Sequence, residues 1–201
     1  MSVENIINIY NLSTPAERRR GLAWYATAFT DCERIANQFG LPVNIVAGVV
    51  SALSPNNKWE RNIDNAHVLI DAFFKGDNIT DFKVSTYNPM KDKAWQILNA
   101  MNPKDNPTMS DDEIAKVLNG QKIISILGYD TCCIDGHAKG IYEGKRFGLT
   151  SPKNHISKKY YKQLQDAYVE AGSKITFRKK NLRAFEIQAI TWVTWKRIHD
   201  I

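Results

Sequence analysis

Apolar residues recur three and four positions apart along most of this chain, which is the spacing of amphipathic helices. A long helix is predicted to begin at Thr14 and Pro15, which supply an N-cap and a proline suited to the first helical position. Gly40 and Pro42 predict its end near residue 39. Further helices are predicted over residues 43–53, 58–74, around 94–98, 110–118, 122–127, 157–171 and 184–199.

The segment 43–53 is apolar on most sides, so we expect it at the centre of the core. No segment alternates with period two for long enough to build a sheet, and residues 84–87 are the one weak strand candidate. Internal repeats and low-complexity segments are absent from the sequence. The pattern therefore predicts an all-α fold, a compact multi-helix domain that comprises residues 1–201 as a single unit.

The composition is that of a folded protein, with 43% apolar and 24% charged residues in a chain of 201. No stretch approaches the roughly 20 apolar residues of a membrane helix, and the N-terminus lacks a secretory signal, so we expect a cytoplasmic protein. The three cysteines provide neither a disulfide framework nor a C-x-x-C pair, which favours small buried side chains. We expect no metal and no cofactor.

The positive charge is concentrated near the C-terminus. The net charge is +6, and the last 28 residues hold seven cations against two acids. A local basic excess is typical of a protein that binds a polyanion, whereas the simpler alternative is a solvated helix face. We predict DNA contacts at Lys179, Lys180 and Arg183.

The last predicted helix carries an indole-rich face, which is more typical of a core or a helix seam than of a base-stacking platform. This face holds Gln188, Trp192, Trp195 and His199. Lys196 and Arg197 fall off it and could reach phosphates.

Two polar segments are candidates for binding. The bend that follows Pro55 combines amides, cations and a flat ring suited to a phosphate or a base edge. Its candidate residues are Asn56, Asn57, Lys58, Trp59 and Arg61. The structural alternative is a helix-capping turn with Trp59 facing the core. The second segment, residues 118–128, is a Gly-containing turn between helices with Lys122 just beyond it, where backbone N–H groups can face a phosphate.

The most informative segment is CCIDGHAKGIYEGKR, residues 132–146, in which Asp135 follows an apolar run. An ionisable side chain at such a position has either a partner or a chemical task, because an unpaired buried carboxylate is costly. Asp135 could stabilise a cationic sugar or activate a nucleophile, and it could equally be the N-cap of the helix that follows. His137 and Lys139 are candidate contacts to substrate or DNA, although a lone histidine is more typical of a structural hydrogen-bonded residue.

In chain order these segments resemble the helix-hairpin-helix DNA glycosylase superfamily, the group that includes endonuclease III. ALSPNN is similar to the family's LSxQ-type helix end, LNGQK to a shortened hairpin, and CIDGHAKGI to its Asp-containing run. The likeness covers about residues 43–150 and implies a glycosylase-like core there, packed by N- and C-terminal helices. It also implies a catalytic role for Asp135 and an imine-forming role for Lys122. The hairpin lacks the family's proline and second glycine, and the four-cysteine iron–sulfur signature is absent.

The ending QAITWVTWKRIH resembles uncharacterised bacteriophage proteins that also carry SPNNKWERN and CIDGHA. Phages that hypermodify thymine use distant glycosylase relatives, so the resemblance implies a phage enzyme of the host cytoplasm. We expect a DNA-acting enzyme that processes a base, modified or not, extruded from the duplex. One alternative is a base-hypermodification transferase on the same fold. The other is a non-catalytic module that binds DNA or protein.

Overall fold

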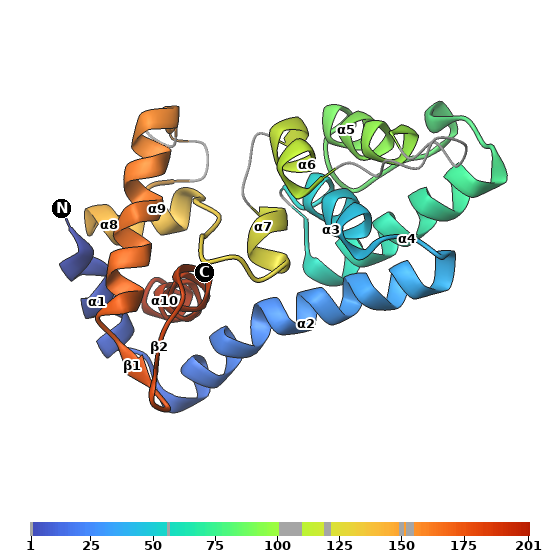
Figure 1. Cartoon of the computed structure of the whole chain (residues 1–201). Helices are drawn as coiled ribbons and strands as arrows, with labels where there is room; N and C mark the ends of the chain where they lie inside the picture. Colours follow the sequence, from blue (N-terminus) through green and yellow to red (C-terminus); the bar gives the residue numbers. More distant parts are fainter. Residues whose placement is uncertain (1, 56, 101–109, 119–121, 149–150, 152–154) are drawn as a thin grey trace. The chain divides into compact units, whose positions relative to one another are not determined.

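The computed structural model describes residues 2–55, 57–100, 110–118, 122–148, 151 and 155–201, and helices dominate it (Figure 1). The elements are α1 (Val3–Asn11), α2 (Pro15–Phe39), α3 (Val43–Ala52), α4 (Trp59–Lys75), the 3-10 helix η1 (Ile79–Asp81), α5 (Asn88–Asn99), α6 (Asp111–Leu118), α7 (Lys122–Ile126), α8 (Gly136–Glu143), α9 (Lys158–Ser173), β1 (Thr176–Phe177), β2 (Lys180–Asn181) and α10 (Ala184–Ile198). The predicted all-α class is confirmed.

The predicted helix starts are correct because their signals are local. At α2, the Glu17 carboxylate accepts a hydrogen bond of 2.7 Å from the backbone of Thr14, whose hydroxyl accepts one of 3.2 Å from the Glu17 N–H. Ser110 and Glu113 make the same reciprocal pair at α6. Such capping boxes satisfy N–H groups that a helix start leaves open.

Three local features differ from the prediction. Residues 84–87 form no strand, and Val3–Asn11 forms a helix that was not predicted. A two-stranded antiparallel hairpin of β1 and β2 was also missed, because two-residue strands are too short to show alternation.

The chain divides into two compact units. Unit 1 holds the residues up to Thr27 together with Gly128–Ile201, and unit 2 holds Ala28–Leu127. The prediction of a single domain stays a prediction.

In unit 2, α3 is the central helix, as predicted. Its residues from Ile45 to Ala52 are all buried, and it contacts α4, α5, α6 and α7. Gly48 permits the approach of α6, because a Cβ built there would lie 2.6 Å from Cγ2 of Ile114.

In unit 1, α10 packs against α1, α8 and α9. Gly21 of α2 lies so close to α10 that a Cβ built on it would be 2.5 Å from Cα of Ile190. On the predicted indole face, Trp195 and Gln188 are buried, while Trp192 is half-buried. That face is therefore mainly core, as expected.

Cys32 and Cys132 are buried, Cys133 is half-buried, and all three are free thiols. Burial raises the pKa of Cys32 to about 12 and that of Cys132 well above its ordinary value. Within the described residues no single helix has both the length and the apolar composition to cross a membrane. The helices α2 and α3 meet that test only as a pair, and they are bent by 118° at the break between them.

Candidate functional site

Asp135 is the N-cap of α8 in unit 1. Its side chain is exposed, and its Oδ1 accepts a hydrogen bond of 2.8 Å from the backbone N–H of Ala138. The predicted capping role is thus confirmed. Oδ2 makes no hydrogen bond within the part of the chain that the structure describes. One carboxylate oxygen therefore holds the helix while the other is available to a ligand.

The hydroxyls of a half-buried and a buried tyrosine hold the start of α8 in place. The Tyr161 hydroxyl accepts a hydrogen bond of 3.0 Å from the backbone N–H of Ile134, just before Asp135. The Tyr168 hydroxyl, fully buried, donates one of 3.2 Å to the carbonyl of Ala138. Burial raises the pKa of Tyr168 well above its ordinary value, so this phenol stays a proton donor. Asp135 is consequently presented from a rigid element.

The neighbours of Asp135 on α8 differ in accessibility. His137 is half-buried, while Lys139 is 6% exposed. The Lys139 ammonium lies 3.8 Å from Oε1 of Glu143 and faces the ring of Phe147 at 5.2 Å. Tyr160 donates a hydrogen bond of 2.7 Å to the same carboxylate. This burial argues against Lys139 as a phosphate contact, since its charge is already satisfied inside unit 1.

The bend before α4, in unit 2, closes the C-terminal end of α3. Asn57 donates a hydrogen bond of 3.3 Å from its side-chain amide to the carbonyl of Leu53, and Asn62 donates one of 2.9 Å to that of Val50. These carbonyls belong to the last turn, where a helix leaves acceptors open. The predicted helix-capping alternative therefore describes this bend. Asn56 lies outside the described residues.

The same junction contains buried polar atoms that make no hydrogen bond to any residue the structure describes. These atoms are the Ser51 hydroxyl and the side-chain carbonyl oxygens of Asn57 and Asn62. A buried polar atom that makes no hydrogen bond costs about 1–3 kcal/mol. Sequence reasoning missed Ser51 and Asn62, because one lies inside an apolar helix and the other in a charged one. Their burial follows from the packing of α3 on α4.

Unit 2 brings Trp59 and Lys122 together. The half-buried Trp59 donates an indole hydrogen bond of 2.9 Å to Asp31, and the Lys122 ammonium lies 5.9 Å from the centre of its ring. Lys58 and Arg61 are exposed beside them. This arrangement offers cations and an aromatic face to a ligand. Residues 119–121, the turn of the predicted hairpin, lie outside the described residues. The convergence of this region with Asp135, which belongs to unit 1, stays a prediction.

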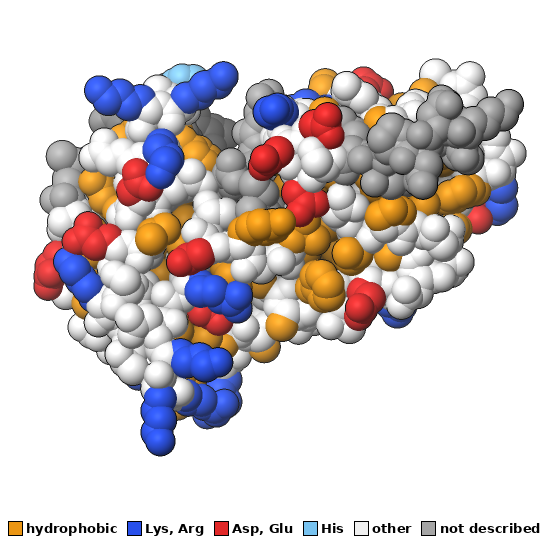
Figure 2. All heavy atoms as spheres, in the orientation of Figure 1, with side chains coloured by type: hydrophobic (Ala, Val, Ile, Leu, Met, Phe, Trp, Pro, Cys, Tyr) orange, Lys and Arg blue, Asp and Glu red, His pale blue; other side chains and the backbone are white. Residues whose placement is uncertain are grey.

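The predicted basic surface of unit 1 is centred on the β1–β2 hairpin, over which Lys and Arg side chains gather (Figure 2). Arg178, Lys179 and Lys180 are exposed there. Arg183 is also exposed, but its guanidinium donates a hydrogen bond of 3.1 Å to the carbonyl of Gly128 and lies 3.4 Å from Glu186. Arg183 therefore has a structural role as well as a charge.

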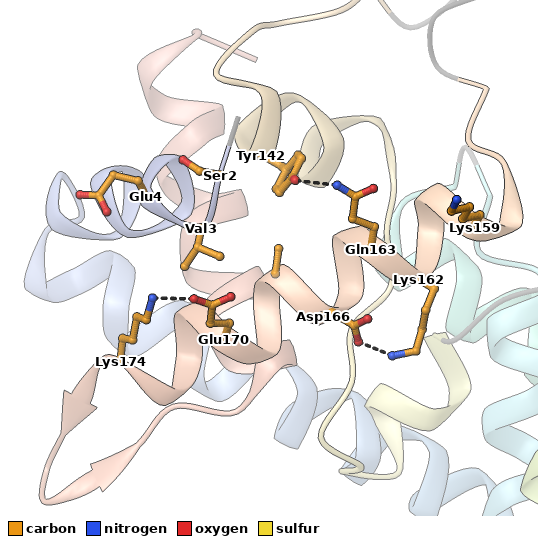
Figure 3. A pocket seen from close by; sticks show the side chains of 11 residues that line it. Ser2, Val3, Glu4, Tyr142, Lys159, Lys162, Gln163, Asp166, Glu170 and Lys174 are labelled. Atoms are coloured by element: carbon orange, nitrogen blue, oxygen red, sulfur yellow. Dashed lines mark hydrogen bonds and ion pairs between the residues drawn. The ribbon is translucent and has the colours of Figure 1, made fainter.

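Described residues of unit 1 line a groove at α9 and another at α10, and Asp135 is not among the residues that line these two. The first, about 770 Å³ in volume, lies between α1 and α9. Four of its charged side chains pair along α9, Lys162 with Asp166 and Lys174 with Glu170 (Figure 3). Such i,i+4 pairs leave this groove with little net charge for a ligand.

The second groove, about 600 Å³, lies between α2 and α10. Trp24 and Trp192 line it, and the Lys196 ammonium sits 4.6 Å from the centre of the Trp192 ring. Arg197 donates a hydrogen bond of 2.7 Å to the carboxylate of Glu17, which lowers the pKa of that acid. Arg197 is thus engaged within the protein. Among the described residues no group of three His, Cys, Asp or Glu side chains could hold a metal ion.

These features define an all-α protein with a cationic hairpin and an exposed aspartate at a helix start. The chain belongs to DUF7178, a family of unknown function, whose model matches residues 1–199. No curated protein matches the chain, and no solved structure does.

Proposed function

We propose that this protein is a DNA-acting enzyme with a fold of the helix-hairpin-helix DNA glycosylase type, encoded by a bacteriophage and acting on an extruded base. The observation that carries the proposal is the Asp135 carboxylate. It is exposed, fixed by a single capping bond from Ala138, and has its Oδ2 uncommitted within the described residues. The resemblance of CIDGHAKGI to the Asp-containing run of the glycosylases supports the same role.

The chemistry follows from a negative charge held beside a sugar. As the bond between C1′ and the base breaks, the base leaves with the bonding electrons and the sugar becomes cationic. The Asp135 carboxylate stabilises that cation, water adds its oxygen to C1′, and the departing base takes up a proton. The resemblance assigns to Lys122, which belongs to unit 2, the role of an amine that forms an imine with the opened sugar.

Trp59 and Lys122 of unit 2 support contact with a base. The half-buried Trp59 ring offers a stacking face, and the Lys122 ammonium lies 5.9 Å from the centre of that ring. The exposed cations of the hairpin would bind phosphates, and Lys58 and Arg61 of the bend would do the same.

Base release from duplex oligonucleotides tests the proposal. The protein is incubated with duplexes carrying unmodified or hypermodified thymine, and the products are identified by mass spectrometry. Free base from the wild type, reduced at least a hundredfold in Asp135→Asn, is the expected result. Equal release by both proteins would remove Asp135 from the mechanism. Altered nucleosides without free base would indicate the transferase alternative.

A second candidate is a DNA-binding module without catalysis. Its supporting observation is that Asp135 is the N-cap of α8, where it accepts a hydrogen bond from the N–H of Ala138, a structural role that needs no catalysis. This candidate predicts that Asp135→Asn binds duplex DNA as the wild type does and that neither protein changes the DNA.

A further inference from the structure

The turn of the β1–β2 hairpin has an unusual backbone. Phe177 pairs with Lys180, so the loop consists of Arg178 and Lys179 alone. Both adopt positive φ, 47° and 68°. Positive φ at both loop positions defines a type I′ turn, which strongly favours Asn-Gly because other side chains are strained there. This hairpin therefore carries two long cationic side chains where its own stability would favour two small residues.

The base of the hairpin is anchored in unit 1. Ile175 and Leu182 are buried at its two ends and are joined by a backbone hydrogen bond of 3.1 Å. A Cβ on Gly172 would overlap the Leu182 carbonyl oxygen, so the hairpin leaves α9 in close backbone contact. The buried residues at the base of the hairpin therefore hold the strained turn in a defined position.

The turn of the hairpin and the residue after it carry cations that are available to a ligand. Arg178, Lys179 and Lys180 are exposed, and within the described residues none of them makes an ion pair with an acid. The Arg178 guanidinium lies 5.5 Å from the centre of the Phe177 ring, a contact that leaves its N–H donors open. Three adjacent free cations at a protruding turn are suited to a polyanion.

We propose that the β1–β2 hairpin is a prong that enters the major groove of B-form DNA, with Arg178 and Lys179 contacting the phosphates and base edges there. This rests on the proposed function only in taking duplex DNA as the partner. The dimensions agree. A two-stranded ribbon fits the major groove, about 12 Å wide, but not the minor groove, about 6 Å wide. Three residue steps of about 3.3 Å lead from the buried Ile175 to Arg178 in the turn, so the hairpin projects by about 10 Å, which matches a groove about 8.5 Å deep.

The test replaces the two cationic loop residues by uncharged residues that a type I′ turn prefers. In Arg178→Asn/Lys179→Gly the loop takes the preferred type I′ sequence, so the melting temperature should rise by about 2–4 °C. Binding to a fluorescent 20-base-pair DNA duplex should weaken at least tenfold. The slope of log Kd against log salt should fall by about 2, because each lost phosphate contact contributes about 0.9.

Two controls distinguish entry of the hairpin into the major groove from non-specific attraction between its charges and DNA. Lys158→Gln/Lys159→Gln removes the same charge from the exposed start of α9 and should change DNA affinity less than threefold. An RNA duplex of the same sequence has a deep, narrow major groove that side chains cannot enter, so the turn variant should bind it as the wild type does. A turn variant no weaker on DNA than the α9 variant would overturn the proposal, as would equal losses on DNA and RNA.

Base release measured in the same samples at saturating DNA keeps the two proposals apart. A wild type that shows the hairpin effect but releases no base refutes the enzymatic function alone. A wild type that releases base while the turn variant binds DNA normally refutes the prong alone.

Discussion

Replacing Asp135 separates its structural role from its proposed chemical role. The structural role is one hydrogen bond of 2.8 Å to the N–H of Ala138. Losing an N-cap to alanine costs about 1 kcal/mol, whereas asparagine caps about as well as aspartate. In a chain of 201 residues, 1 kcal/mol lowers the melting temperature by about 2–4 °C. We therefore expect Asp135→Ala to melt 2–4 °C below the wild type and Asp135→Asn within about 2 °C of it.

Ser157 supplies the matched control. It is the exposed N-cap of α9, and its hydroxyl accepts a hydrogen bond of 3.3 Å from the N–H of Tyr160. Ser157→Ala should lose the same stability as Asp135→Ala but keep full base release. Thermal unfolding followed by far-ultraviolet circular dichroism, with base release on the same preparations, measures both. If activity follows melting temperature across the three variants, Asp135 only caps the helix and the reasoning fails.

Further predictions concern an acid, a glycine and the thiols. Arg197 and Thr14 lower the pKa of Glu17 below its ordinary 4.5, so its charged form stabilises the fold above that pH and the contribution is lost as the pH falls. The melting difference between wild type and Glu17→Gln should accordingly be largest at pH 7 and shrink below about pH 4.5; a difference that is constant with pH would contradict this. Gly172→Ala should cost about 1–3 kcal/mol in urea unfolding, while Gly148→Ala, in open space, should be neutral; equal effects would contradict the close approach. Ellman's reagent at pH 8 should modify only the half-buried Cys133 in the native protein and all three thiols in guanidinium; rapid native modification of more than one would show that the burial is wrong.

The candidate site was only partly predictable. The sequence singled out Asp135 and correctly offered the N-cap as one role, because a cap and its acceptor lie three residues apart. It selected Lys139 as a DNA contact, but nothing local shows that packing places this lysine against Phe147 and Glu143. The sequence also could not predict the burial of the Asn62 side-chain oxygen, which accepts no hydrogen bond from a described residue. Its burial depends on which face of α4 meets α3.

The sequence alone determined the helices, their starts at Thr14 and Ser110 and the central position of α3, because capping bonds and apolar periodicity act within a few residues. Only the tertiary structure decided which charges remain free in water. Lys139 is buried, and Arg183 is tied to Gly128. The hairpin cations remain exposed, and the hairpin that carries them passes close to α9 because Gly172 has no side chain. A charge's availability depends on neighbours distant in sequence, and no local pattern encodes that.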